Sequence, residues 1–448
     1  MFNQSFSVQN LKSIVNFQNR NGVYLEKQFF PDAVSISKQI VELNKELREQ
    51  RKIKKGEEYR IYFKEKMKIK DDLLKQRAVV IEKKLNCISK KISENNISFH
   101  LTKAKTANGK YLYTLEPTAE SFFTLKYIQY ALSRTYKVHQ KNRNIIINQI
   151  LSHFRGKPSY PFYLVRTDVK DFYESINTDK VLAKINRENL IIPTAKRIIN
   201  QLIQIEYLNK HNNTKGLPRG LGISAYLSEI FMSPIDEKIK KNPNVIFYSR
   251  YVDDIFVLFR KSENLSCEQA HKYVQEEIER EGDLKVNSTK TKSFEVGTGQ
   301  NKNTDYLGYN LQFSANGIAV TISNKRLEKL KIKIDRSFGS YHAGSKISEK
   351  KARKLLKKRI RFLTGNTRLY NRKKNVLVGS YFSNKFITDL SKLQELDKHL
   401  KDHFSKSKFS AKLTHLGQFS FEDGFNSKKF HRFTPNELKK IVECWEYV

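Results

Sequence analysis

Two adjacent acidic residues, Asp253 and Asp254, interrupt a largely apolar stretch at residues 245–259. Two apolar runs about a short polar break predict a β-hairpin with the acids at its tip. Neighbouring carboxylates repel each other and are poor sheet formers, so a purely structural role does not account for them. The repulsion is relieved if divalent cations bind there, because hard cations prefer oxygen ligands.

A third acid, Asp168, ends a β-rich apolar run at residues 162–168. Taken alone it could be no more than the N-cap of a following helix. Together the three acids suit nucleotidyl transfer, which uses two Mg²⁺ about 4 Å apart, one activating a 3′-hydroxyl and one holding a triphosphate. Asp168 and Asp253 would hold the ions, with Asp254 as a weaker ligand.

Charge is the outlying property of the composition. Lys and Arg number 84 against 46 Asp and Glu, a formal net charge of +38. Such an excess favours a polyanionic partner, and nucleic acid is the leading candidate. A membrane surface is the competing interpretation, but we find no apolar run near transmembrane length and no signal-peptide pattern at the start. The three cysteines (Cys87, Cys267, Cys444) are far apart, which predicts buried free thiols in a reducing cytoplasm.

The pattern along the chain predicts an α+β fold. Apolar residues at helical spacing predict helices at 34–51 and 57–95. The middle of the chain mixes helical spacing with the alternation typical of strands. Further helices are expected at 223–240 and 267–281, the latter stopped by Gly282, and strands at 284–287, 293–296, 305–313 and 318–323. After residue 323 the chain becomes helical and basic, and residues 350–361 place Leu355, Leu356 and Ile360 on one face. The cations around them suit either a solvated surface or nucleic acid.

Several short blocks, taken in order, resemble those of reverse transcriptases. Tyr251-Val252-Asp253-Asp254 matches the YxDD box of that family, and Asp168 matches its first metal aspartate. The blocks around Gly216–Gly220, Leu284–Lys290 and Tyr306–Tyr309 follow in the family's order, so the resemblance covers about residues 130–320. It implies a right-hand polymerase with a helical N-terminal region (1–97), fingers and palm (98–323) and a basic helical thumb (324–448). It also implies two Mg²⁺, with Mn²⁺ as a substitute.

The resemblance assigns roles to individual residues. It places Val169, Tyr173, Arg219, Gly220, Lys290 and Arg143 at the nucleotide, and Tyr251, Gly308 and Tyr309 at primer and template. The ring of Tyr173 would crowd a ribose 2′-hydroxyl and so favour deoxynucleotides. The alternative interpretation is that Tyr173 is a tyrosine of the hydrophobic core. Lys290 would neutralise the departing pyrophosphate or is one of many surface lysines. Arg219 stands where many relatives have Gln, and Arg134 and Lys141 accompany Arg143 among the cations of the fingers.

Three blocks resemble the bacterial abortive-infection and defence-associated reverse transcriptases: residues 160–176, 224–229 and 361–369. This implies RNA-directed DNA synthesis from dNTPs in antiphage defence, with a noncoding RNA as template and a companion protein or a homo-oligomer as a further partner. Template-independent or protein-primed synthesis by the same kind of enzyme, and a catalytically retired nucleic-acid-binding scaffold, remain alternatives. An RNA-directed RNA polymerase is disfavoured by Tyr173.

Overall fold

The structure is a computed structural model that describes residues 4–106, 109–139, 141–154, 161–208, 216–297, 300–314, 317–369, 376–406 and 416–446. Its helices and antiparallel sheets confirm the predicted α+β class. The chain forms two compact units: Met1–His139 with Thr178–Ile230, and Gln140–Asn177 with Phe231–Val448. The boundary between them falls within one helix, α10 (Ser224–Lys240).

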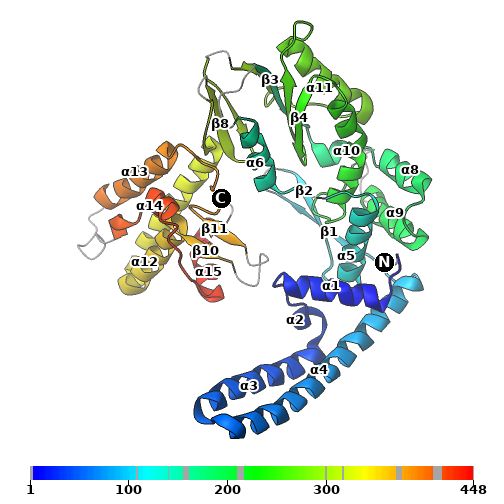
Figure 1. The fold of residues 1–448 in the computed structure, drawn as a ribbon, viewed down its shortest axis with the longest axis vertical. Coiled ribbons are helices and arrows are strands. Elements are labelled where there is room, and N and C mark those ends of the chain that lie inside the picture. The colour runs from blue at the N-terminus through cyan, green and yellow to red at the C-terminus, as the bar shows by residue number, and fades with distance from the viewer. Residues whose placement is uncertain are drawn as a thin grey trace. The chain divides into compact units, whose positions relative to one another are not determined.

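The first unit is mainly helical (Figure 1). Besides the start of α10 it contains α1 (Val8–Arg20), α2 (Glu26–Phe29), α3 (Pro31–Ile53), α4 (Gly56–Ser93), β1 (Leu101–Lys105), β2 (Tyr111–Leu115), α5 (Ala119–Thr135), α8 (Thr178–Glu188) and α9 (Pro193–Leu208).

A long antiparallel pair of helices, α3 and α4, confirms the two helices predicted within residues 34–95 (Figure 1). Gly56 begins α4 with φ +60°, a conformation that glycine adopts without strain, and Asn95 (φ 59°) follows its end. The buried residues of α4 are Leu85, Ile88 and Ile92, spaced at one helical turn. Cys87 falls between them on the solvent side of the helix, so its predicted burial is wrong.

The second unit holds the mixed and basic parts of the chain. Besides the end of α10 it contains α6 (Arg143–His153), β3 (Phe162–Asp168), α7 (Phe172–Ser175), β4 (Val245–Tyr251), β5 (Asp254–Arg260), α11 (Cys267–Gly282), β6 (Lys292–Val296), β7 (Lys302–Tyr306), β8 (Tyr309–Ser314), β9 (Gly317–Ile322), α12 (Asn324–Thr364), β10 (Asn366–Arg368), β11 (Leu377–Gly379), α13 (Ser391–Lys406), α14 (Phe421–Asn426), α15 (Pro435–Val442) and the 3₁₀ turn Glu443–Trp445.

One antiparallel sheet, in the order β4-β5-β3-β6, organises this unit. It confirms the predicted strand at 162–168 and the predicted hairpin at 245–259. β5 is almost continuously buried, with Ile255 to Phe259 all fully inaccessible, because it lies between β4 and β3 at the centre of the sheet. A second antiparallel sheet, β7-β8-β9, follows it in the chain.

Three predicted boundaries are wrong. Helix α11 includes Gly282, and the left-handed residue that caps it is Asp283 (φ 58°), a short polar residue that tolerates this conformation. Residues 284–287 form no full strand: Val286 makes an isolated bridge to Val169 before the chain turns at Asn287. The strand expected at 305–313 is interrupted by a turn at Leu307 and Gly308, which separates β7 from β8.

Helix α12 carries the basic segment predicted at 350–361, and its backbone is non-helical at Ser348. Leu356 and Ile360 are buried as expected, while Leu355 is half-buried. Arg359 is also buried, with its guanidinium donating to the Ile441 carbonyl at 3.3 Å and to Ser340 Oγ at 2.8 Å. This cation therefore joins α12 to the C-terminal segment and is not part of the solvated surface.

In the part of the chain that the structure describes, none of the helices combines the length and apolar character needed to cross a bilayer. All three cysteines lie in that part and are free, and Cys267 and Cys444 are half-buried.

Candidate active site

The three acids predicted from the sequence meet at one end of the β3–β5 pair. Asp168 and Asp254 are direct cross-strand partners, and Asp254 also pairs with Tyr251 across the hairpin. The turn between β4 and β5 contains only Val252 and Asp253, so Asp253 sits beside Asp254. The Val169 N–H donates to the Asp253 carbonyl at 3.1 Å, which fastens the turn to the strand that carries Asp168.

The electrostatics of Asp254 reflect this crowding. Its pKa is raised to about 7, mainly by burial; the charges of Asp253 and Asp168 add to the rise, and Arg166 opposes it. The folded chain thus holds this proton more tightly than the unfolded chain, so the contribution of Asp254 to stability declines as the pH rises from about 4 to about 7. A bound cation would reverse that preference, because it favours the ionised carboxylate.

Two cations contact the acids directly. Lys290 Nζ lies 2.5 Å from Asp168 Oδ2, although its side chain is 57% exposed and could move to another anion. Arg166 Nη2 lies 2.7 Å from Asp254 Oδ1, and its Nη1 donates to the Lys290 carbonyl at 2.9 Å. Lys290 was predicted to belong to this site.

Arg166 was not predicted as a site residue. It lies two residues before Asp168 on β3, and alternate residues of a strand share a face. That spacing is the signal that could have identified it.

The donor set fits a divalent cation. Asp168 is 5% exposed, and its Oδ1 atom has no hydrogen-bond partner among the described residues. A buried carboxylate oxygen without a partner is costly, and ligation by a cation would satisfy it. Oxygen ligands from Asp168, Asp253 and Asp254 match the preference of Mg²⁺ or Mn²⁺.

A buried ion pair braces the turn. Arg250 is 1% exposed, and its Nε and Nη2 lie 2.8 and 2.7 Å from the two carboxylate oxygens of Asp236 on α10. Its Nη1 donates to the Val252 carbonyl at 2.9 Å, within the turn that carries Asp253. The Tyr248 hydroxyl also donates to Asp236, at 2.5 Å.

This brace holds an unfavourable backbone conformation. Val252 has φ 60°, a region that β-branched residues rarely adopt. The Arg250–Asp236 pairing was missed by sequence reasoning, because nothing in the spacing of the two residues signals a contact between a helix and a hairpin.

Two of the predicted nucleotide residues, Val169 and Tyr173, lie close to Asp168 in the chain. Val169 is buried and forms the bridge to Val286. Tyr173 lies in the short helix α7 and is half-buried, packed edge-on against the buried Phe172 at 5.3 Å between ring centroids. Tyr173 is therefore not a core tyrosine, and its action on the nucleotide stays a prediction.

Of the three predicted primer residues, Tyr251 ends β4 opposite Asp254, while Gly308 and Tyr309 lie at the turn between β7 and β8. Leu307 and Gly308, both with positive φ, make the turn between β7 and β8, and the following Tyr309 is buried. The Arg143 guanidinium carbon lies 4.9 Å from the centre of the Tyr309 ring, a cation–π geometry. The structure thus groups Arg143 with Gly308 and Tyr309, although it was predicted to contact the triphosphate. Lys141, another predicted cation, lies 5.9 Å from the Tyr248 ring.

Arg219 and Gly220 belong to the first unit, where they pack against β2. The Tyr113 N–H donates to the Arg219 carbonyl at 2.7 Å. Gly220 has φ +99°, and a Cβ there would lie 2.6 Å from the Tyr113 carbonyl oxygen. The space left by its missing side chain is therefore taken by β2. Arg134, in the same unit, stacks on Tyr130 at 5.3 Å.

Comparison with known protein families gives a match over residues 97–311, to the family described as reverse transcriptase (RNA-dependent DNA polymerase). This part of the chain is similar to the reverse transcriptase family. The matched segment covers slightly less than half of the chain and contains Arg166, the three acids and Lys290. No curated protein sequence matches the chain.

Solved structures that match parts of the chain include three telomerases, all at low identity and with low TM-scores. The apo telomerase of Candida tropicalis truncated from its C-terminal domain is 15% identical, with 52% of this chain and 59% of that chain covered and a TM-score of 0.33. The Candida albicans telomerase in complex with a TWJ fragment of telomeric RNA is 13% identical (73% and 57% covered, TM-score 0.34). The corresponding Candida tropicalis complex is 11% identical (82% and 68% covered, TM-score 0.38). The chain thus spans less than two thirds of the first two.

Proposed function

We propose that this protein is a reverse transcriptase that copies RNA into DNA with two divalent cations, Mg²⁺ or Mn²⁺, held by Asp168, Asp253 and Asp254. The observation that carries the proposal is the cross-strand pair Asp168–Asp254 beside Asp253, with a buried Asp168 oxygen lacking a partner among the described residues. The similarity of residues 97–311 to the reverse transcriptase family supports it. A retired scaffold would have no reason to hold a half-buried carboxylate of raised pKa beside two others.

The residues around the acids have distinct tasks in this proposal. When bound, the cations would lower the pKa of the attacking 3′-hydroxyl and neutralise the triphosphate. Arg166 orients Asp254 through their 2.7 Å ion pair, and Lys290 can transfer its contact from Asp168 to a departing pyrophosphate. Tyr173 excludes the ribose 2′-hydroxyl, which makes dNTPs the substrates. Arg219 and Gly220 support the nucleotide. Primer and template contact Tyr251, Gly308 and Tyr309. Residues 324–448 form the thumb.

Primer extension by the purified protein tests the activity. An RNA template with a DNA primer, dNTPs and Mg²⁺ should give full-length product, and Asp253→Asn/Asp254→Asn should reduce it by at least about 10³-fold, since metal-ligand carboxylates stabilise the transition state. Asp283→Asn is the matched control, because it removes an exposed carboxylate at a position where Asn tolerates the same left-handed backbone. Unchanged incorporation by the double variant would refute the site.

The same assay separates the alternatives. DNA made without any template would indicate template-independent synthesis, and product covalently attached to the protein would indicate priming from a protein hydroxyl. Incorporation of NTPs in preference to dNTPs would indicate an RNA polymerase. Nucleic-acid binding without any incorporation would indicate a scaffold.

We further propose that the synthesis serves antiphage defence in the bacterial cytoplasm, with a noncoding RNA as template and a companion protein or a second copy of the chain as partner. Support comes from the sequence blocks shared with defence-associated reverse transcriptases and from the +38 net charge. Cells expressing the wild type should reduce phage plaque numbers, and cells expressing Asp253→Asn/Asp254→Asn should not. Equal protection by the wild type and the double variant would show that defence does not require polymerisation. Sequencing the copurified nucleic acid would identify the template.

A further inference from the structure

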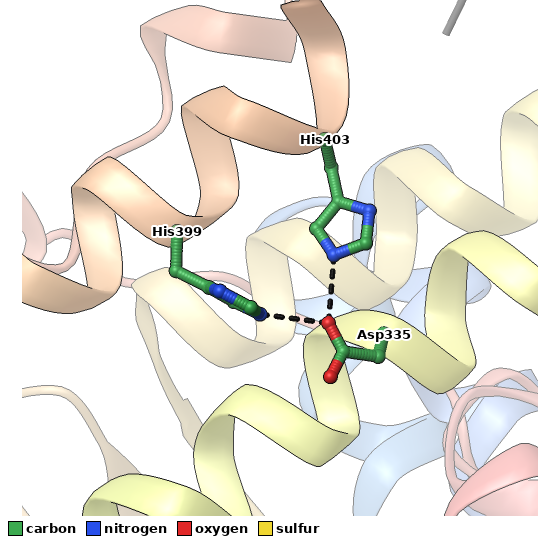
Figure 2. Close-up of side chains that lie close together, drawn as sticks. All are labelled: Asp335, His399 and His403. Atoms are coloured by element: carbon green, nitrogen blue, oxygen red, sulfur yellow. Dashed lines mark hydrogen bonds and ion pairs between the residues drawn. The ribbon is translucent and has the colours of Figure 1, made fainter. Parts of the chain in front are cut away.

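A compact group of metal-ligand side chains lies away from the polymerase acids, on the pair of helices α12 and α13. His399 Nε2 and His403 Nε2 each lie 2.7 Å from Asp335 Oδ1, and these three ligand atoms all lie within 4.8 Å of one another (Figure 2). The histidines are four residues apart on α13, so both project from one face toward α12.

We propose that Asp335, His399 and His403 bind one zinc ion. Two imidazole nitrogens and one carboxylate oxygen are a donor set that Zn²⁺ accepts, and three protein ligands leave a fourth position for water or an external ligand. Ligands of a tetrahedral zinc lie roughly 3.3 Å apart, given bonds of about 2.0–2.1 Å. The present 2.7 Å contacts would therefore need to open by only about 0.6 Å. The ion would replace the hydrogens that the two Nε2 atoms now direct at Asp335.

Packing holds the three side chains in place. The His403 ring stacks on Phe338 of α12 at 4.5 Å between centroids and 10° between planes, and Phe338 is itself buried. Leu396 and Leu400 of α13, together with Ile334 of α12, are buried in the same core and so fix the rotation of both helices. The ligands lie at the edge of this core.

The surroundings leave the site available to a cation. Lys331, one turn before Asp335 on α12, is paired with Glu328 and Glu395 at 3.0 and 2.7 Å, so its charge is already neutralised. Both histidine side chains are 29% exposed and Asp335 is 47% exposed, which lets an ion reach them from solvent without opening the core.

The site is not that of a zinc hydrolase. The helix carries His399-Leu400-Lys401-Asp402-His403, and a general base commonly follows the first histidine in metallopeptidase helices of this spacing. Here that position is the buried Leu400. The ion would therefore act as a clamp between α12 and α13, independently of the polymerase chemistry.

Zinc binding by the full-length, tag-free protein tests the proposal, after chelator treatment and in excess Mg²⁺ to occupy the polymerase acids. One Zn²⁺ per chain should bind to the wild type and raise its Tm. His399→Gln and Asp335→Asn should each weaken the affinity by at least about tenfold and lose the Tm shift. His342→Gln, an exposed histidine of the same helix α12, is the matched control and should behave like the wild type.

Equal zinc affinity and stoichiometry in the wild type and His399→Gln would overturn the proposal. Wild-type protein loaded with Co²⁺ gives a second measurement that needs no variant. Visible absorption bands of four-coordinate Co²⁺ that disappear when Zn²⁺ is added would support the site. The weak spectrum of hydrated Co²⁺ would overturn the proposal. Asp335, His399 and His403 would then form only an ion pair between the two helices.

Discussion

Arg250 combines two interactions that a single side chain rarely makes while fully buried. One is the bidentate pair with Asp236, and the other is the hydrogen bond to the Val252 carbonyl in the turn that carries Asp253. Buried ion pairs often contribute little net stability, because their desolvation offsets their attraction. The second interaction suggests that Arg250 positions the turn, whose Val252 backbone costs about 1–3 kcal/mol to hold.

Replacing the pair separates these two effects. Arg250→Met should destabilise the protein by about 3–5 kcal/mol, because it leaves Asp236 buried without its cation. Arg250→Met/Asp236→Leu should recover most of that stability, since apolar pairs of similar volume substitute well for buried ion pairs. Primer extension should stay impaired in the double variant, because the Val252 carbonyl still lacks its donor. Denaturant unfolding and extension rates measure both, and recovery of both would show that Arg250 acts through stability alone.

Tyr173 gives a second prediction at the scale of one residue. Tyr173→Ala should raise the use of NTPs relative to dNTPs by about 10- to 100-fold, because it removes the ring that would crowd a 2′-hydroxyl, while dNTP incorporation should fall little. The measurement is the ratio of kcat/KM for matched NTP and dNTP. Tyr173→Phe is the control, since it keeps the ring and should keep the selectivity. An unchanged ratio in Tyr173→Ala would remove Tyr173 from substrate selection.

At the scale of elements, the approach of β2 to the loop at Arg219 and Gly220 depends on a missing side chain. Gly220→Ala should destabilise the protein by about 2–4 kcal/mol, since it combines a left-handed φ with a Cβ placed 2.6 Å from the Tyr113 carbonyl oxygen. Gly56→Ala is the matched control, because Gly56 has φ +60° and no atom within 4 Å of the added Cβ. It should cost only about 1 kcal/mol. Equal costs in urea unfolding would show that the close approach to β2 is not a constraint.

The elements that sequence reasoning located well are those with a local signal. Strand β3, the β4–β5 hairpin and helices α3 and α4 each show their apolar period within their own residues. Residues 284–287 alternate apolar and polar residues, yet they form only an isolated bridge at Val286, with Lys285 and Asn287 hydrogen-bonded to Lys170 and Asp168. Whether a run becomes a strand depends on its neighbour, which lies far away in the chain.

The residues of the candidate site also differ in whether the local sequence signals them. The three acids were predicted because charge in an apolar hairpin is conspicuous on its own. Arg166, by contrast, meets Asp254 through the register of two strands separated by more than eighty residues. Asp335 meets His399 and His403 through the packing of two helices. Such contacts follow from tertiary structure and leave little trace in residue spacing.

At the scale of the whole molecule, the net charge of +38 should dominate nucleic-acid binding. If about 6–10 phosphates are neutralised, the affinity for an RNA–DNA duplex should fall by about 10³–10⁵ between roughly 50 and 200 mM salt. Replacing the exposed Lys350, Lys351 and Lys354 of α12 by Gln should reduce the slope of log K against log salt by up to about 2.7, at about 0.9 for each phosphate that is no longer neutralised.

Three exposed lysines on another helix provide a matched control, which tests whether α12 in particular binds the nucleic acid. Lys64, Lys68 and Lys83 are exposed on α4, and replacing them by Gln removes the same charge. We expect this second set to leave the slope nearly unchanged, as measured by fluorescence anisotropy over a salt series. Equal reductions in both sets would mean that total charge, and not α12, governs binding.

The position of β3 in its sheet also has a consequence during synthesis on the ribosome. β3 lies between β5 and β6, but β5 emerges about 90 residues later and β6 later still. At about 5–20 residues per second, a nascent chain displays this apolar strand with both edges open for roughly 5–18 s. During that interval neighbouring ribosomes on the same message can bring identical strands together. We therefore expect production of soluble protein to depend on chaperones that cover this segment until residue 296 has left the exit tunnel.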